Sequence, residues 1–586
     1  MTVAEQTSSI TSLTDSQWLL READERQVMA IMQRHHLPEV LARILTVRGV
    51  GLDEVDDFMN PSLKASMPDP SHLLDMDVAA ERIASAVMAG ERIGIFGDYD
   101  VDGATSSALL MRYFRALGTD PLVHIPDRMV EGYGPNAPAL LGLKEKGAAL
   151  VITVDCGTLA FEPLEAAHEA GLDMIVVDHH QGEARKPKCL ALVNPNRIDE
   201  TSTHGQLAAV GVAFLLCVAV NRKLRETGFF ADKAEPDLRG WLDIVALGTV
   251  CDVVPLTGLN RALVAQGLKV IAGRGNLGMR TLMDSAGVDS KPSTYTCGFV
   301  MGPRINAGGR VGKSDLGVRL LTTENDAEAK QLAAELEQYN AERKAIEATV
   351  LEEAMAQAEA AADSPMLTIA GKGWHPGVIG IVASRVKERF NVPTAIVALD
   401  DGVGKASARS VSGVDLGAAV IAAMDSGLLV AGGGHAMAAG FTVEEDKLPA
   451  LSEFLNEHVA RQSEGLSKQK CYKLDGTISI AGATVDLVEK LERLGPFGQG
   501  NPSVRIAVQK VVNLKPEIVG EHHVRTIFID KLSNARLTGI AFRAVDGPLG
   551  EALLSTRGKE VQVAGQLKLN EWNGRTSVQI HIDDIA

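Results

Sequence analysis

Three carboxylates stand at alternate positions of one short segment, Asp98-Tyr-Asp100-Val-Asp102-Gly103, in this 586-residue chain. The apolar run 93–96 before the segment predicts a strand, and a helix-like stretch begins at Ala104. Carboxylate oxygens are hard ligands that suit Mg²⁺ or Mn²⁺ better than zinc. Three like charges this close together are costly unless a cation neutralises them. The segment therefore favours a divalent-metal site, with a solvated acidic turn as the alternative.

The same segment matches the first half of an EF-hand calcium loop, which requires a carboxylate at its twelfth position. Counted from Asp98, the twelfth position is Leu109, and the preceding residues are strand-like rather than helical. The spacing excludes an EF-hand.

Two further apolar, β-branched runs end at side chains that bind metals. Residues 149–154 lead to Asp155, and residues 174–177 lead to Asp178-His179-His180. Continuous apolar runs separated by helix-like segments such as 161–170 indicate a buried parallel sheet. Ligands of such sheets bind beyond the carboxyl ends of the strands. All three acidic sites are expected on that edge.

A fourth carboxylate, Asp252, lies within the otherwise apolar stretch 246–255. A buried Asp needs a partner, because an unpaired charge in such surroundings costs several kcal/mol. A core hydrogen bond would serve for an isolated Asp, but three other acidic sites make metal ligation the better interpretation. Likewise, two adjacent histidines after an Asp at a strand end are unlike a lone core histidine.

These motifs, in this order, resemble the DHH phosphoesterase superfamily, which takes its name from the Asp178-His179-His180 triplet. The later motifs resemble those of its RecJ single-stranded-DNA exonucleases, over roughly residues 70–586. Gly302-Pro-Arg304-Ile-Asn306-Ala-Gly-Gly-Arg310 is similar to the fifth motif of that family. Three stretches resemble the associated DHHA1 domain, and a fourth is typical of RecJ proteins: residues 373–385, 407–410, 432–440 and 495–502.

The resemblance implies an α/β fold in which a DHH parallel-sheet domain is joined by a long helix to a DHHA1 α/β domain, followed by a β-rich OB-fold. The stretch from Glu324 to Ala362 has no Gly or Pro and is dense in Ala, Glu, Lys and Leu, which favours a long helix. Short alternating segments from Tyr472 onward indicate a β module. The expected units are an N-terminal helical segment (1–70), the DHH catalytic domain (71–322), the connecting helix (323–363), the DHHA1 domain (364–462) and the OB-fold domain (463–586).

The resemblance also implies roles for particular side chains. Two Mn²⁺ or Mg²⁺ ions, about 3.5–4 Å apart, would activate a water for attack on the scissile phosphate. Their expected ligands are Asp98, Asp100, Asp102, Asp155, His179 and Asp252. His180 would contact the phosphate or help to protonate the leaving group, Asp178 would orient a ligating imidazole, and Arg304 and Asn306 would stabilise phosphoryl charge.

Further residues are expected to bind the nucleic acid. Arg128 and Tyr133 would form part of a pocket for the 5′ end, and Ser407 and Arg409 would hold the terminal 5′ phosphate. Other phosphate contacts are expected from Arg310, His375, Gly433, Gly434 and His435. Because only 4% of the residues are aromatic, base stacking would depend on a few rings, with Tyr133 and Trp374 as candidates that could equally be core residues.

The implied function is removal of nucleotides from the 5′ end of single-stranded DNA in recombination and repair. The alternative is a DHH/DHHA1 phosphodiesterase acting on short oligonucleotides or cyclic dinucleotides, which generally lacks residues like 495–502 and the C-terminal β module. A catalytically dead scaffold is disfavoured because all candidate ligands are intact. The implied partners are single-stranded DNA, single-strand-binding protein and a RecQ-type helicase, and we expect a monomer.

Composition and charge limit the possible classes of protein. No apolar run approaches the roughly 20 residues of a membrane span, and the polar, acidic first 25 residues lead us to expect no secretion signal. Six scattered cysteines fit a reducing cytoplasm. The net charge of −17 argues against nucleic acid if taken alone. Bound metals and a local basic groove can nevertheless coexist with an acidic exterior.

Overall fold

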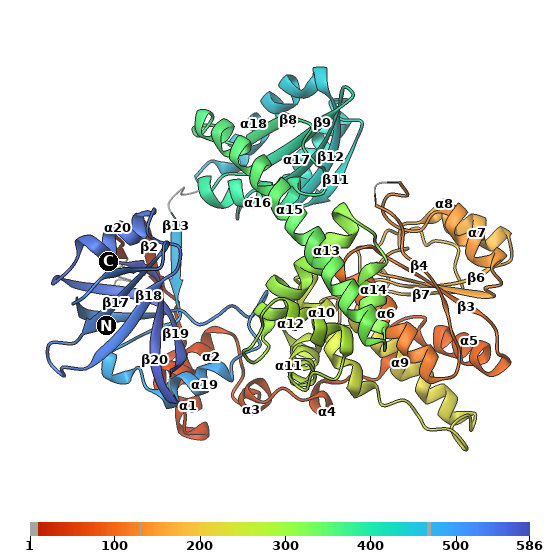
Figure 1. The fold of residues 1–586 in the computed structure, drawn as a ribbon, viewed down its shortest axis with the longest axis horizontal. Helices are drawn as coiled ribbons and strands as arrows, with labels where there is room; N and C mark the ends of the chain where they lie inside the picture. Colours follow the sequence, from red (N-terminus) through yellow and green to blue (C-terminus); the bar gives the residue numbers. More distant parts are fainter. Residues whose placement is uncertain (1–9, 129, 466–469, 573) are drawn as a thin grey trace.

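The fold is organised around a five-stranded parallel sheet in the computed structural model, which describes residues 10–128, 130–465, 470–572 and 574–586 (Figure 1). The strand order is β4-β3-β5-β6-β7, and every neighbouring pair is parallel. The three central strands are buried along nearly their whole length, as expected of a sheet with helices on both faces. The strands are β3 (Ile93–Gly97), β4 (Leu122–His124), β5 (Leu150–Val154), β6 (Asp173–Val177) and β7 (Ala191–Val193).

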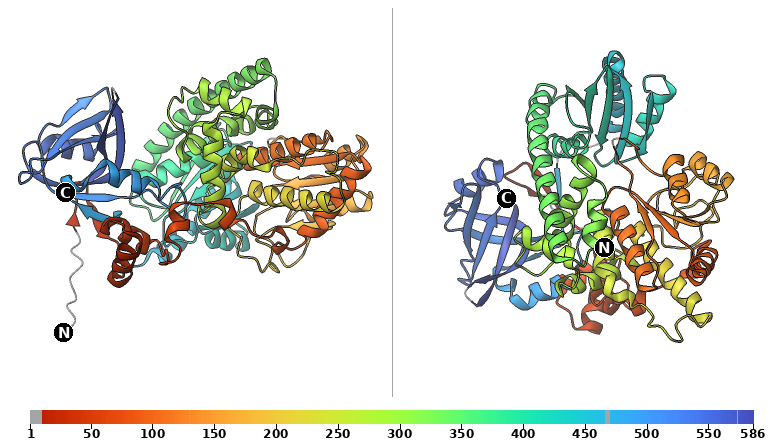
Figure 2. Two further views of the ribbon diagram at one scale, coloured as in Figure 1. Left: turned by 90° about the horizontal axis from the view of Figure 1, so that it is seen from below. Right: turned by 45° about the vertical axis from the view of Figure 1, so that its right-hand side comes forward.

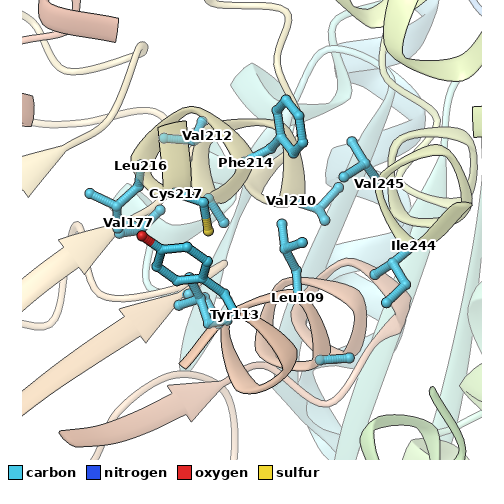
Figure 3. Close-up of a cluster of buried hydrophobic side chains, with 14 of the residues drawn as sticks. Leu109, Tyr113, Val177, Val210, Val212, Phe214, Leu216, Cys217, Ile244 and Val245 are labelled. Atoms are coloured by element: carbon cyan, nitrogen blue, oxygen red, sulfur yellow. The ribbon is translucent and has the colours of Figure 1, made fainter. Parts of the chain in front are cut away.

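Helices α6 (Val101–Ala116), α9 (Ala209–Glu226) and α10 (Leu242–Cys251) form much of the main hydrophobic core of this first α/β domain. In Figure 3, Leu109 and Tyr113 of α6 point toward Val210 and Cys217 of α9, and Ile244 of α10 packs beside them. The buried Tyr113 hydroxyl donates a hydrogen bond of 2.8 Å to Asn221 Oδ1, so the core leaves this polar atom satisfied. Among the described residues, no helix is long and apolar enough to cross a membrane.

Ten α-helices, α5 to α14, belong to the first α/β domain in the described part of the chain. They are α5 (Met76–Ala89), α6 (Val101–Ala116), α7 (Ala137–Glu145), α8 (Phe161–Glu169), α9 (Ala209–Glu226), α10 (Leu242–Cys251), α11 (Gly258–Ala272), α12 (Leu277–Ser285), α13 (Gly302–Val311) and α14 (Leu316–Thr322). Short helices are η1 (Pro70–His72), η2 (Leu238–Trp241) and the π-helix η3 (Thr296–Met301).

One long helix, α15 (Asp326–Ala360), runs from the first α/β domain to the second (Figure 1). It begins at Asn325, whose side chain accepts hydrogen bonds from the first backbone N–H groups of the helix. Leu332 and Leu336 belong to the core of the first domain, whereas Val350 and Ala354 belong to the core around β8 and α16. Because both ends are packed, the helix fixes the spacing of two domains over roughly 50 Å.

The second α/β domain has a five-stranded sheet in the order β11-β12-β10-β9-β8, in which only β8 and β9 are parallel. Strand β11 therefore lies at one edge of the sheet. The elements are β8 (Leu367–Lys372), α16 (Ile379–Phe390), β9 (Thr394–Asp400), β10 (Val403–Arg409), α17 (Leu416–Asp425), β11 (Ala431–His435), β12 (Ala438–Glu444), η4 (Glu445–Lys447) and α18 (Leu448–Ser463).

The C-terminal part is a β domain with a closed barrel. Strand β15 pairs with both β19 and β17, and the circuit β15-β19-β20-β18-β17 closes, as expected of a five-stranded OB-fold. The elements are β13 (Lys470–Leu474), β14 (Gly476–Ile478), η5 (Ile480–Gly482), α19 (Val485–Glu492), β15 (Ile506–Asn513), β16 (Glu517–Val519), β17 (His523–Ile529), β18 (Arg536–Ala541), α20 (Pro548–Ser555), β19 (Glu560–Trp572) and β20 (Arg575–Ile585).

The N-terminal segment packs against the C-terminal β domain, and the left view of Figure 2 shows its red helices beside the blue β domain. Its helices share one core cluster with the barrel, and β2 pairs in parallel with β13. The buried Trp18 donates from Nε1 to Asp584 Oδ2 at 2.8 Å. Besides the expected helices, this segment thus contains two strands that the sequence did not predict. Its elements are β1 (Ile10–Thr11), β2 (Ser16–Leu20), α1 (Glu25–His35), α2 (Glu39–Val47), α3 (Val55–Met59) and α4 (Leu63–Ser66).

Candidate metal centre

The predicted ligands meet at the carboxyl edge of the first sheet. Asp98 follows β3, Asp155 follows β5, and the Asp178-His179-His180 triplet follows β6. These three strands are neighbours in parallel register, so their ends lie side by side. Asp252 reaches the same place from the C-terminal end of α10.

His179 lies at the centre of the cluster. Its Nε2 is 3.3 Å from Asp155 Oδ1, 3.6 Å from Asp252 Oδ2 and 3.9 Å from Asp102 Oδ2. Its Nδ1 lies 3.1 Å from the Leu207 carbonyl oxygen, which fixes Nδ1 as the protonated atom and leaves Nε2 as a metal ligand. Three overlapping sets have ligand atoms within 4.8 Å of one another: Asp98 with Asp100 and Asp155, Asp102 with His179 and Asp252, and Asp155 with His179 and His180.

Two carboxylate oxygen atoms of the cluster are placed as a bound cation would require. Asp98 Oδ1 and Asp252 Oδ2 are buried and have no hydrogen-bond partner among the described residues. A buried carboxylate oxygen without a donor is costly. A divalent ion would satisfy both atoms, and the mixture of carboxylates with one imidazole suits Mn²⁺ or Mg²⁺.

Burial and mutual repulsion raise the pKa values of these carboxyl groups. Burial, followed by the charge of Asp100, raises the pKa of Asp98 to about 8 and that of Asp102 to about 7. Burial and the charges of Asp102 and Asp100 raise the pKa of Asp252 to about 9. The pKa of Asp155 lies well above its ordinary value for the same reasons. A bound cation would reverse these shifts because it favours the ionised forms.

Two of the predicted ligands also hold helices in place. Asp100 caps α6 by accepting from the backbone N–H groups of Asp102 and Gly103 at 2.9 and 3.1 Å. Asp102 accepts from the N–H groups of Ala209 and Val210 at 2.7 and 3.0 Å, at the start of α9. The cluster is thereby tied to the two helices that form the core beneath it.

Asp178 orients His180 rather than the ligand His179. The Asp178 carboxylate accepts from His180 Nδ1 at 2.7 Å and from the Thr158 and His179 backbone N–H groups at 3.0 and 2.7 Å. Burial alone would raise the pKa of Asp178, but its hydrogen bonds and both imidazoles hold it well below the usual range. Burial alone would lower the pKa of His180, and its hydrogen bond with Asp178 together with nearby carboxylates raises it instead.

Arg128 and Tyr133 lie beside this cluster. The Tyr133 hydroxyl is 3.3 Å from His180 Nε2, and the side chain is about half exposed. The Arg128 guanidinium lies over the Tyr99 ring at 5.2 Å from its centroid. Tyr99 meets Tyr133 edge-on, with ring centroids 6.4 Å apart. Both predicted residues therefore lie beside the candidate metal ligands. Tyr99, which was not predicted as a site residue, contacts both of them.

Arg304 and Asn306 lie on α13, and the arginine is held by two neighbours. The Arg304 guanidinium forms an ion pair of 2.5 Å with Glu337 on α15 and donates to the Val300 carbonyl at 2.8 Å. Asn306 is half-buried on the same helix. The structure thus directs Arg304 toward the connecting helix, and a role in phosphoryl stabilisation stays a prediction for both residues.

The candidates near the second domain form a separate group. Arg310 Nη1 donates to the Gly377 carbonyl at 2.7 Å, which joins the two α/β domains, and His375 Nδ1 accepts from the Gly377 N–H at 3.0 Å. Arg409 donates to Ser407 Oγ at 3.0 Å beside the start of α16. Gly433, Gly434 and His435 are exposed on the edge strand β11. Strand β12 lies between β11 and β10, and across it Gly433 is in register with Ser407 and His435 with Arg409.

An apolar cavity of about 930 Å³ adjoins Asp252 between the first domain and the β domain. Its rim carries three exposed aromatic rings, of which Tyr295 and Phe299 stack with centroids 5.1 Å apart. The third ring, Phe542, comes from the β domain. In contrast, Trp374 is only 6% exposed and donates to Glu353, so the core alternative holds for it.

The fold and the ligand cluster together define a metal-dependent phosphoesterase of the DHH type. Family models match residues 92–249 (DHH family, N-terminal domain), 363–461 (DHHA1 domain) and 474–584 (RecJ OB domain). These matches confirm the predicted α/β architecture with a C-terminal OB domain.

Relatives of known name refine this class. The chain is 36% identical to the single-stranded-DNA-specific exonuclease RecJ of Escherichia coli over 96% of this chain and 98% of that protein. It is 33% identical to the RecJ of Bacillus subtilis over 97% of this chain and 70% of that one. The crystal structure of Thermus thermophilus RecJ in complex with Mn²⁺ superposes with a TM-score of 0.81 at 30% identity, covering 97% of this chain and 79% of that chain. The chain belongs to the RecJ family of single-stranded-DNA-specific exonucleases.

Proposed function

We propose that this protein degrades single-stranded DNA from the 5′ end to mononucleotides, using two divalent ions. The observation that carries the proposal is the cluster around His179, whose carboxylates and imidazole lie within reach of shared cations. The RecJ relatives and the Mn²⁺- and Mg²⁺-bound RecJ structures support the same substrate and metals.

Each side chain of the centre has a distinct task in this proposal. Asp98, Asp155, His179 and Asp252 hold the ions, while Asp100 and Asp102 serve both as ligands and as helix caps. When bound, divalent ions supply Lewis-acid activation of water and neutralise charge on the phosphate. His180, held by Asp178 and raised in pKa, contacts the phosphate or gives a proton to the leaving oxygen.

The DNA strand beyond the scissile phosphate runs toward the β domain through the aromatic cavity. Tyr295, Phe299 and Phe542 offer exposed rings there, and Lys568 adds a positive charge to the lining. Stacking of a base on an aromatic ring contributes about 1–3 kcal/mol without regard to sequence. This arrangement favours a polymer over the alternative substrates, short oligonucleotides or cyclic dinucleotides, which need no second domain to bind.

The 5′ end lies on the opposite side of the metals in this proposal. Arg128 and Tyr133 contact the terminal nucleotide, and Ser407 with Arg409 binds its 5′ phosphate. Arg310, His375 and the exposed residues Gly433, Gly434 and His435 would add phosphate contacts, and Arg304 and Asn306 would act on the transferring group. Single-strand-binding protein and a RecQ-type helicase are proposed as partners of a cytoplasmic monomer.

The test is digestion of a single strand labelled at either end and carrying a 5′ phosphate, beside a blunt duplex and a dinucleotide. We expect immediate release of the 5′ label as mononucleotide, a spared duplex, and complete inhibition by EDTA. Rapid cleavage of the dinucleotide with long strands untouched would assign the protein to the small-substrate phosphodiesterases instead.

A further inference from the structure

The loop Gly495–Pro502, between α19 and β15, resembles a stretch typical of RecJ proteins. In the structure it is held by internal hydrogen bonds and also contacts the first α/β domain. Asn501 is 3% exposed and closes the loop by donating from Nδ2 to the carbonyl oxygens of Leu494 and Pro496 at 2.9 and 2.8 Å. A backbone bridge between Gly498 and Asn501 closes the other side. The loop is therefore a rigid unit of the C-terminal β domain.

This rigid loop docks on the first α/β domain directly after the metal ligand Asp252. The Leu256 N–H donates to the Gln499 carbonyl at 2.7 Å, and Thr294 Oγ1 donates to the Phe497 carbonyl at 2.8 Å. Both donors belong to segments of the metal-binding domain. The two domains are thus joined by main-chain acceptors whose positions the loop fixes.

The approach is close enough to require glycine at two positions. A Cβ atom at Gly498 would lie 2.7 Å from Leu256 Cδ1, and one at Gly500 would lie 2.9 Å from Pro255 Cβ. Gly500 also has φ +71°, which side chains rarely adopt. The glycines permit the loop to press on the 253–257 turn.

The 253–257 turn needs such support. Val253 has φ 62°, an uncommon conformation for a β-branched residue, and it is 65% exposed, so its own side chain does little to hold it. Strained backbone persists only where its surroundings over-determine it. The surroundings here are the Leu256–Gln499 hydrogen bond and a 3.1 Å hydrogen bond from Asn260 Nδ2 to the Pro255 carbonyl.

We propose that the loop Gly495–Pro502 is a positioning element for the metal centre. It holds the 253–257 turn so that Asp252 Oδ2, which has no hydrogen-bond partner among the described residues, stays 3.6 Å from His179 Nε2. The N-terminal segment completes the element, because Arg48 donates to Asn501 Oδ1 and at 2.7 Å to the Pro502 carbonyl. The effect on catalysis rests on the exonuclease function proposed above. The effect on metal binding can be measured without it.

The experiment compares the full-length protein with two variants, Gly498→Ala and Thr294→Val, by calorimetric titration of the metal-free protein with MnCl₂ alone. Gly498→Ala inserts a methyl group into the contact with Leu256, and Thr294→Val removes one hydrogen bond at nearly constant volume. We expect about tenfold weaker Mn²⁺ binding, the size typical of groups that support a metal ligand from outside. The kcat on single-stranded DNA should fall, while KM stays within about twofold.

The matched control is Gly275→Ala, since a Cβ there would meet no described atom within 4 Å. It should leave Mn²⁺ affinity and kcat unchanged. Wild-type Mn²⁺ affinity in both loop variants would overturn the proposal, as would a rise in KM with metal affinity intact, which a mere domain contact predicts. If Gly498→Ala fails to fold, judged by circular dichroism, Thr294→Val decides alone. A wild type that binds Mn²⁺ but leaves DNA intact would refute the proposed function without refuting this inference.

Discussion

The metal centre and the phosphate-binding candidates of the second α/β domain differ in how firmly the fold holds them. Asp98, Asp102 and Asp155 are at most 4% exposed and lie at neighbouring strand ends or helix starts of one domain. Gly433 to His435 lie on an exposed edge strand of the second domain, which α15 and contacts such as that between Arg310 and Gly377 place relative to the candidate ligands. The candidate metal ligands therefore all come from one domain, supported from outside by the loop Gly495–Pro502, whereas the proposed recognition of the DNA end depends on the placement of two domains.

Removal of one buried ligand should give the largest effect, and it should affect chemistry without harming the fold. Asp155→Asn removes a carboxylate that lies 3.3 Å from His179 Nε2, so we expect kcat to fall by at least roughly 10²–10³-fold, the effect of losing one strong electrostatic group. The metal-free protein should not lose stability, because a buried like charge is removed. Steady-state digestion and thermal melts in EDTA measure both quantities. Asp120→Asn, at a surface ion pair with Arg115, is the control that should change neither.

The next largest effect distinguishes a proton-transfer role of His180 from the metal-binding role of the candidate ligands around it. His180→Gln should lower kcat by about 10²-fold if the imidazole transfers a proton, with Mn²⁺ affinity close to that of the wild type. The Asp178→Asn variant keeps a hydrogen-bond acceptor for His180 Nδ1 but removes the negative charge that helps to raise the pKa of His180. The limb of the kcat–pH profile that requires protonated His180 should then move to lower pH. A profile with an unmoved limb would exclude His180 as the titrating acid.

The clustering of the candidate ligands Asp98, Asp155 and His179 could be predicted from sequence because each lies just after a short apolar run. A strand end fixes where the next side chain lies, and adjacent parallel strands place their ends together, so Asp98, Asp155 and His179 needed no tertiary information beyond the sheet. The orientation of Asp178 toward His180 could not be predicted in this way, since it depends on the rotamers of two adjacent residues.

Features that join distant parts of the chain were not predicted. Phe299 lies on a π-helix and Tyr295 directly precedes it, and both line one cavity with Phe542 across a domain boundary. Nothing in their spacing indicates this. Strand β2 pairs with β13, more than 400 residues later, which a local pattern does not encode. The burial of Trp374 could not be predicted either, because it depends on the contact with α15 and not on the neighbours of Trp374 in sequence.

A change in the second domain should give a smaller and more selective effect than a change at the metals. Arg409→Ala removes a guanidinium held beside Ser407, and a charge-assisted hydrogen bond contributes about 1.5–3 kcal/mol. We expect a roughly 10–100-fold loss of kcat/KM on 5′-phosphorylated strands and little change on strands with a 5′ hydroxyl. Arg389→Ala, an exposed arginine in the last turn of α16, is the control. Equal losses on both substrates would mean that Arg409 does not bind the 5′ phosphate.

The smallest effect concerns the pH dependence of stability, and it tests whether the buried centre is strained without metal. The pKa values of about 8 for Asp98, 7 for Asp102 and 9 for Asp252 lie above the ordinary value for Asp. A group with a raised pKa in the folded state contributes stability at low pH and loses it as the pH rises through that pKa. The metal-free protein should therefore lose several °C in Tm between pH 6 and 9, as these three groups ionise.

With saturating Mg²⁺ the same groups are ionised throughout, so the Tm should change much less over this range, and the stabilisation by Mg²⁺ should grow with pH. Scanning fluorimetry in EDTA and in Mg²⁺ measures the two curves. Asp252→Asn removes a group whose pKa is raised to about 9 and should flatten the EDTA curve above pH 8. Parallel curves in EDTA and Mg²⁺ would mean that the carboxylates are not held together against their repulsion. The contrast between a buried metal centre and exposed phosphate-binding candidates in the second domain would then lose its main support.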